Sequence, residues 1–177
     1  MDILETIKNR TSCRSYLDKP VPDDALERCL EAARWAPSAC NKQPWRFVVI
    51  KDRELRERIC AECFLPGVPM PWAKQAPVII VLCSKKSVVT HLLAPLLSGI
   101  NYHLLDLGIA GEHLVLEAQE QGLGSCWIGW IQPKKIRKVL KLPPGITPVS
   151  LITLGYPRDI TLPGRRLEMS EIVIGKF

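Results

Sequence analysis

An unbroken apolar run, Ala76 to Cys83 (APVIIVLC), limits the fold of this chain more than any other feature of its sequence. A strand with one face in water alternates apolar and polar residues, whereas a strand buried on both faces is apolar throughout. The run therefore predicts a central strand with a packed layer on each side. The 177 residues of the chain suffice for one domain with a core of that kind.

The remaining segments predict further strands and helices around this central strand. Strand patterns occur at residues 45–52, 125–131 and 147–157. Helix patterns occur at residues 2–9, 22–37, 52–63, 98–121 and 132–142. Because strands and helices follow one another without regular alternation, their order indicates an α+β layer architecture. The tail is rich in turn residues, and we expect it to end in a short apolar strand that pairs elsewhere.

The net charge of +6 and the isoelectric point of about 9.0 bear on the partners of the chain. Such a balance is compatible with nucleic acid, an acidic membrane surface or a ligand that carries phosphate. The basic residues are spread along the chain, without a long Lys/Arg run or a recognisable nucleic-acid module. We therefore expect neither nucleic acid nor a membrane as a partner.

Cysteine and histidine usage predicts no metal site. The seven cysteines are an odd number and no signal peptide is visible, which favours a reducing, cytoplasmic location. Cys60 and Cys63 form a C-x-x-C at the end of a helix pattern, where we expect two packed thiols and no zinc or redox site. His91, His103 and His113 lack the spacing of metal ligands.

The stretch NRTSCRSY, residues 9–16, is the first that suggests a ligand. In an extended segment Arg10, Ser12 and Arg14 point to one side, and two guanidinium groups flanking a hydroxyl match a phosphate. Cys13 then points the other way and is expected to pack in the core. The alternative is a solvated helix end, because Arg and Ser usually lie at the surface.

A second stretch that suggests a ligand is APSACNKQPWRF, residues 36–47. A helix pattern ends at Pro37, and a polar turn with Ser38, Asn41 and Gln43 follows before the strand begins. Asn and Gln side chains each offer a donor and an acceptor, which suits a ring whose edge carries N–H and C=O groups. The alternative is a loop in which these side chains cap the local backbone.

A third stretch that suggests a ligand is GLGSCWIGWI, residues 122–131. Gly129 lies inside an apolar, aromatic strand pattern, where glycine weakens a strand unless something approaches the backbone closely. A flat aromatic ligand would do so. The alternative is a bulge or tight packing against a helix.

Common catalytic motifs are absent from the chain. It has no G-x-S-x-G, H-E-x-x-H, G-x-x-x-x-G-K or G-x-G-x-x-G sequence. A chain with candidate binding residues and no evident acid, base or nucleophile is typical of an enzyme whose cofactor carries the reaction.

In this order, the three stretches resemble the FMN-dependent nitroreductase family, NAD(P)H-dependent flavin oxidoreductases. IKNRTSCRSY is similar to the family's phosphate motif, and AARWAPSACNKQPWRFVVI to its Ala-Pro-Ser-x-x-Asn-x-Gln-Pro-Trp signature. DLGIAGEHLVLEAQEQGLGSCWIG resembles its central helix and flavin-facing turn, and LITLGYP with PGRRLE its last strand and C-terminal arm. The resemblance covers nearly the whole chain.

The resemblance implies a fold and an assembly. Residues 1–177 would form one FMN-binding domain, a three-layer sandwich whose central mixed or antiparallel sheet is flanked by helices. Two copies would form a homodimer with FMN at the subunit interface. The C-terminal arm, about residues 158–177, would be exchanged between the subunits.

The resemblance also implies which residues hold the cofactor. Arg10, Thr11, Ser12 and Arg14 would bind phosphate, ribityl or ring-edge oxygens of FMN. Other contacts would come from the partner's loop, the strand near the ring and the arm: Pro37, Ser38, Asn41, Ile128, Gly129, Arg166 and, one residue earlier, Arg165. Lys74 or Trp72 would stand where relatives have an Asn or Lys at the pyrimidine edge, and Trp130 beside Gly129 would narrow the space over the flavin.

The activity implied is a ping-pong reaction in which the flavin carries the chemistry and no side chain is an obligatory catalyst. NADH or NADPH would give a hydride to FMN, and a nitroaromatic, quinone or similar acceptor would then take the electrons. Two alternatives remain open at this point. One is a specialised relative of dehalogenase-like or flavin-modifying type, and the other is a flavin-binding protein without turnover.

Overall fold

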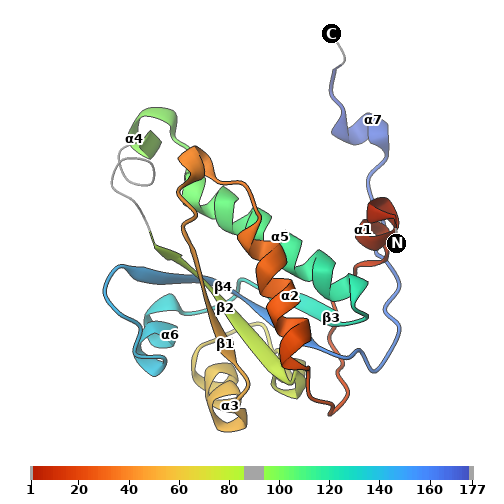
Figure 1. Cartoon of the computed structure of the whole chain (residues 1–177), viewed down its shortest axis with the longest axis vertical. Coiled ribbons are helices and arrows are strands. Elements are labelled where there is room, and N and C mark those ends of the chain that lie inside the picture. Colours follow the sequence, from red (N-terminus) through yellow and green to blue (C-terminus); the bar gives the residue numbers. More distant parts are fainter. Residues whose placement is uncertain (1, 86–93, 176–177) are drawn as a thin grey trace.

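The computed structural model describes residues 2–85 and 94–175. Its centre is a four-stranded antiparallel sheet in the order β1-β2-β4-β3 (Figure 1). The strands are Trp45–Ile50 (β1), Val78–Lys85 (β2), Gly124–Ile128 (β3) and Ile146–Gly155 (β4). The patterns at residues 45–52, 76–83, 125–131 and 147–157 each contain a strand, although β3 ends at Ile128 and leaves Gly129 outside it. The apolar run lies in the interior of the sheet as β2.

The two faces of β2 are covered by different helices, as an all-apolar strand requires. Val78, Ile80 and Leu82 pack with α2 (Asp23–Arg34) and α5 (Tyr102–Glu120). The alternate residues of β2, Ile79, Val81 and Cys83, pack on the other face with α3 (Arg53–Glu62) and α6 (Pro133–Val139). The predicted three-layer α+β sandwich is therefore confirmed.

Shorter elements complete the described chain. They are α1 (Ile3–Asn9), α4 (Ala94–Ser98), α7 (Met169–Ile172) and the 3-10 turns η1 (Ala39–Asn41) and η2 (Pro71–Gln75). After α1 the chain runs along the free edge of β3, where Ser12 forms a parallel bridge with Ser125. This contact adds a parallel neighbour to an otherwise antiparallel sheet.

Helix α5 is apolar on both its core face and its outer face. Leu107, Ala110 and Leu114 are buried in the core, whereas Leu104 and Leu105 are 45% and 55% exposed in the single chain. The expected start near Ser98 was wrong, because α4 ends there and α5 begins at Tyr102. Gly99 separates the two helices with a φ of +71°, a left-handed conformation that an α-helix cannot continue through.

The C-terminal tail leaves the body of the domain and extends past α1 (Figure 1). Its described residues form the short helix α7 just before the apolar residues predicted as a strand, and the pairing of that strand elsewhere stays a prediction. A capping box between Glu168 and Glu171 stabilises that turn, while a strand would need a neighbouring strand to pair with. Ile160 and Ile174 are 94% and 100% exposed. Exchange of this arm between subunits stays a prediction.

Two further predictions concern membranes and metals. Within residues 2–85 and 94–175, no helix combines the length and apolar character needed to cross a bilayer. No group of three or more Cys, His, Asp or Glu side chains in these residues is arranged to hold a metal ion. His91 lies outside the described residues.

Candidate functional site

The edge of β3 positions the Arg10–Arg14 segment. Helix α1 ends at Arg10, whose N–H donates to the carbonyl of Thr6 at 3.0 Å, and the chain then becomes extended. The N–H of Cys13 donates to the carbonyl of Ser125 at 2.8 Å, and the Cys13 side chain is buried, as expected. Because side chains alternate in an extended segment, Ser12 and Arg14 point away from Cys13.

The three predicted phosphate ligands gather near one buried thiol. Burial raises the pKa of Cys126, and three neighbours oppose this rise: the charge of Arg14, a hydrogen bond with Ser12 and the charge of Arg10. The bridge of Ser12 to Ser125 places this segment beside β3, the strand that carries Cys126. Arg10, Ser12 and Arg14 therefore lie along one extended segment at the edge of β3.

The two arginines differ in their partners. Arg10 lies 3.8 Å from a carboxylate oxygen of Glu112, and its side chain is only 20% exposed. Arg14 is exposed, and its guanidinium carbon lies 5.9 Å from the centre of the Trp72 ring. Among the described residues no carboxylate pairs with Arg14, so its charge is available to an anionic ligand.

The turn η2 presents two of its side chains to different places. Trp72 contacts Arg14 and packs with the buried residues Cys13, Tyr16 and Ala76. Lys74 instead lines a separate cavity beside α3. Of the two residues that could stand at the pyrimidine edge, Trp72 is the one beside the Arg10–Arg14 segment.

The end of β3 is open at Gly129. Ile128 is buried, whereas Gly129 is exposed, and a Cβ at Gly129 would have no atom within 4 Å. The alternative of tight packing against a helix is therefore wrong for this glycine. The neighbouring Trp130 donates its indole N–H to the carbonyl of Pro66 at 3.0 Å, which fixes an aromatic side chain beside the open position.

The loop after α2 is strained and internally hydrogen-bonded. Cys40, Asn41 and Gln43 have φ angles of 50°, 51° and 46°, a region unfavourable for residues other than glycine. The Ser38 hydroxyl accepts from the Gln43 N–H at 2.9 Å, and the Gln43 side-chain amide donates to Oδ1 of Asn41 at 3.0 Å. These contacts match the alternative in which the loop's polar side chains cap the local backbone. Pro37 and Asn41 nevertheless remain exposed.

Asp106 on α5 anchors this loop. Its Oδ1 accepts from the backbone N–H of Ala39 at 3.0 Å, and the residue is buried. The sequence offered one signal for it, an acidic residue in the apolar pattern of α5, and that signal did not identify its partner. Asp106 thus connects the core helix to the turn that presents Asn41.

Replacing Asp106 with alanine is expected to lower the free energy of unfolding by about 2 kcal/mol, because the partly buried N–H of Ala39 loses its carboxylate acceptor. Asp106→Asn keeps an acceptor oxygen and should lose about half as much. Denaturant unfolding at fixed protein concentration measures both values. Equal losses in the two variants would show that the hydrogen bond to Ala39 is not the reason for the burial of Asp106.

Arg165 and Arg166 lie on the exposed arm. Arg166 donates to the carbonyl of Gly164 at 2.8 Å. In the described part of the chain, no hydrogen bond or ion pair connects either arginine with the Arg10–Arg14 segment. The loop after α2 is also held elsewhere, at the opposite end of α2 from that segment (Figure 1). One chain therefore carries separate groups of predicted ligands.

Cys60 and Cys63 show no sign of activation. Burial raises the pKa of Cys60 to about 11, and it also raises the pKa of Cys63. Both are free thiols at the end of α3, as the helix pattern predicted. A thiol with a raised pKa is protonated at neutral pH and is a poor nucleophile.

Comparisons with known proteins agree with the fold and with the order of the three stretches. The model of the Nitroreductase family matches residues 7–65 and 64–156. A Methanothermobacter thermautotrophicus protein named as an NADH dehydrogenase/NAD(P)H nitroreductase is 36% identical over 164 residues, covering 90% of this chain and 79% of its own. The FMN reductase [NAD(P)H] of Bacillus subtilis is 28% identical, covering 97% of this chain and 72% of its own.

A solved structure extends the agreement to three dimensions. The hypothetical oxidoreductase YcnD from Bacillus subtilis superposes with a TM-score of 0.85 at 28% identity, covering 98% of this chain and 73% of that one. The match of the family model over residues 7–156 includes the Arg10–Arg14 segment, the loop after α2 and the end of β3. This chain belongs to the nitroreductase family.

Proposed function

We propose that the protein is an FMN-dependent oxidoreductase that takes a hydride from NADH or NADPH and passes electrons to a nitroaromatic, quinone or similar acceptor. The observation that carries this proposal is that the segment with Arg10, Ser12 and Arg14 runs along the edge of β3, the strand that ends just before the open backbone at Gly129. The names of the relatives support the same redox class, and one of them is an FMN reductase.

The residues present fit FMN as the cofactor. Arg10 and Arg14 supply guanidinium donors and Ser12 a hydroxyl, a donor set suited to phosphate and ring-edge oxygens. Gly129 leaves room for a flat ring to approach the backbone at the end of β3. Trp72, stacked with Arg14, would border the same space and limit where the ring can lie.

When bound, FMN would supply the hydride and electron transfer that side chains cannot perform. The chain's own contribution is then binding and electrostatics. Arg14 would place positive charge where negative charge develops. Trp130, tied to Pro66, would restrict the substrates that reach the open backbone.

We propose that a second copy of the chain completes the site. The apolar outer face of α5 and the exposed arm support this assembly, because large exposed apolar surfaces mark interaction sites. The loop with Pro37, Ser38 and Asn41 would then reach FMN held by the partner, and Arg165 or Arg166 would approach it from the arm.

Mixed dimers test the shared site. One chain carries Arg10→Ala with Arg14→Ala, the other Ser38→Ala with Asn41→Ala, and different tags allow purification of the mixed dimer. Symmetry gives the mixed dimer one site with both defects and one intact site, so it should hold about one FMN while each parent dimer holds almost none. Equally empty mixed and parent dimers would place each complete site within one chain.

The bound cofactor tests the function itself. Purified protein should be yellow, and heating should release FMN and not FAD, as chromatography of the supernatant would show. Colourless protein that does not change the spectrum of added FMN would contradict the proposal.

A further inference from the structure

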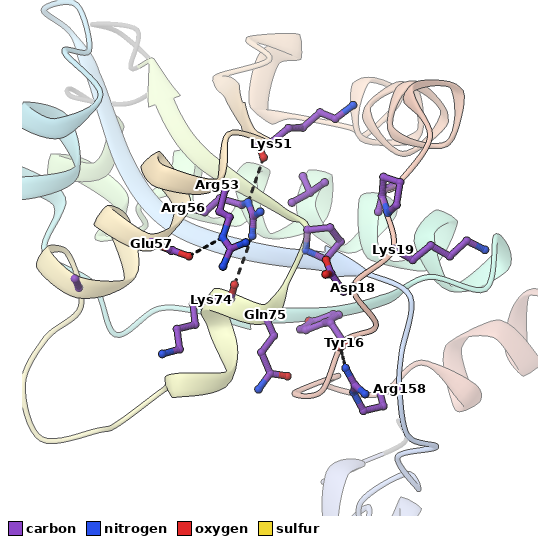
Figure 2. Close-up of a pocket in the computed structure, with 15 residues that line it drawn as sticks. Tyr16, Asp18, Lys19, Lys51, Arg53, Arg56, Glu57, Lys74, Gln75 and Arg158 are labelled. Atoms are coloured by element: carbon purple, nitrogen blue, oxygen red, sulfur yellow. Dashed lines mark hydrogen bonds and ion pairs between the residues drawn. The ribbon is translucent and has the colours of Figure 1, made fainter.

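One cavity of the structure is lined by none of the residues assigned to the cofactor and plays no part in the proposed reaction. It has a volume of about 750 Å³ and lies between residues 16–21, the start of α3, the end of η2 and the start of the arm (Figure 2). None of Arg10, Ser12, Arg14, Trp72 or Gly129 lines it. Tyr16, Val21 and Val78 provide a buried floor.

The walls of this cavity are strongly cationic. The lining includes two acidic residues, Asp18 and Glu57, and six basic ones: Lys19, Lys51, Arg53, Arg56, Lys74 and Arg158. Lys51 pairs with Asp23 at 2.7 Å, and Arg53 pairs with Glu57 at 2.9 Å. Among the described residues the other four have no carboxylate partner. Like charges held around one space repel one another, and a bound anion would relieve that repulsion.

Two of the unpaired cations are fixed by the backbone. Arg56 donates to the carbonyls of Lys51, Lys74 and Ala76. Arg158 donates from its side chain to the carbonyl of Tyr16 at 3.2 Å. Figure 2 shows the side chains of Arg56, Arg158 and Lys74 at different sides of the cavity, whereas Lys19 projects away from them toward the Tyr156 ring. Groups already held in place lose less conformational entropy when a ligand binds.

We propose that this cavity binds a small phosphorylated ligand with two adjacent phosphoryl groups, of the size of a nucleoside diphosphate. Guanidinium and ammonium groups from several segments can each contact a different phosphoryl oxygen. The volume lies within the range of small-molecule sites, and the apolar floor has room for the organic part. The same chemistry would accept free pyrophosphate. The site does not depend on the proposed function.

Calorimetric titration of the protein, with whatever cofactor it retains, tests this site. The probes are inorganic pyrophosphate, ADP and adenosine. Pyrophosphate and ADP should bind, and Lys74→Gln with Arg158→Gln should weaken them by at least about tenfold, since two charge-assisted contacts are lost. Tighter binding of ADP identifies a nucleotide as the ligand, and equal binding identifies the free diphosphate.

Two comparisons make the test specific. Lys134→Gln with Lys138→Gln removes the same charge from exposed positions of α6 outside the cavity and should weaken binding by less than about twofold. Lys19 makes no hydrogen bond to the backbone in the described structure, and its ammonium lies 4.0 Å from the centre of the Tyr156 ring. Lys19→Gln removes this ring contact together with one charge at the edge of the cavity, and should weaken binding by about threefold.

Four results would overturn the proposal. They are absence of binding at about 1 mM probe, adenosine binding as tightly as ADP, equal weakening in the α6 control, and release of FMN by pyrophosphate with unchanged affinity in the cavity variants. The last result would place the ligand at the phosphate position of the cofactor.

Discussion

Replacing Arg10 and Arg14 together with alanine is expected to weaken FMN binding by at least about 100-fold. Each guanidinium can make a charge-assisted hydrogen bond worth about 1.5 kcal/mol or more, and about 1.4 kcal/mol corresponds to a factor of ten in affinity. Arg10 is largely shielded from solvent, so its contribution should be the less screened of the two. Titration of the cofactor-free protein with FMN, followed by flavin fluorescence, gives the dissociation constants.

A control variant that removes two positive charges elsewhere distinguishes direct contacts of Arg10 and Arg14 with FMN from an effect of net charge. Arg58 on α3 pairs with Glu62 at the surface, and Lys138 is exposed on α6. Arg58→Ala with Lys138→Ala should change FMN affinity by less than about threefold at physiological salt. If both double variants lose affinity equally, Arg10 and Arg14 do not contact the cofactor. Arg14→Lys keeps the charge and loses the planar guanidinium, so its FMN affinity should lie between those of the two double variants.

Gly111→Ala is expected to lower the free energy of unfolding by about 3 kcal/mol, because it overpacks the contact between α5 and the sheet. A Cβ at this position would overlap the Trp127 indole and lie 2.8 Å from Cδ2 of Leu82. Trp127 lies on β3 and Leu82 on β2, so any relief must come from movement between α5 and the sheet. Denaturant unfolding at fixed protein concentration measures the loss.

A double-mutant cycle identifies the cause of this loss. Trp127→Phe removes the part of the indole that the new Cβ would overlap. The double variant Gly111→Ala/Trp127→Phe should therefore be at least about 1 kcal/mol more stable than the sum of the single losses predicts. Strict additivity would show that Gly111 is needed for another reason, such as backbone conformation.

The sequence predicted the layers of the fold because burial on two faces leaves a local pattern. The run containing Ile79 and Ile80 identified the interior strand. The alternation of side chains in the Arg10–Arg14 segment predicted that Cys13 points into the core and Arg14 away from it. The break at Gly99 and the short helix α7 were missed, because the first depends on a left-handed backbone conformation and the second on a local capping box. Periodicity does not contain that information.

The sequence predicted which segments form the candidate site, and it did not predict the long-range contacts that hold those segments in place. The hydrogen bond from Ala39 to Asp106 spans 67 residues, so no local pattern reveals it. The choice between Trp72 and Lys74 also needed three dimensions, since the turn η2 sends them to different surroundings. The cationic cavity draws its side chains from four separate segments, and each segment alone reads as an ordinary charged surface.

The most direct test of the proposed activity is anaerobic titration of the yellow protein with NADH and with NADPH, followed at the flavin absorbance band. At least one nucleotide should bleach the band, and adding a quinone or a nitroaromatic should restore it. A protein whose bound FMN is bleached by neither nucleotide would contradict the account and leave a flavin-binding protein without turnover.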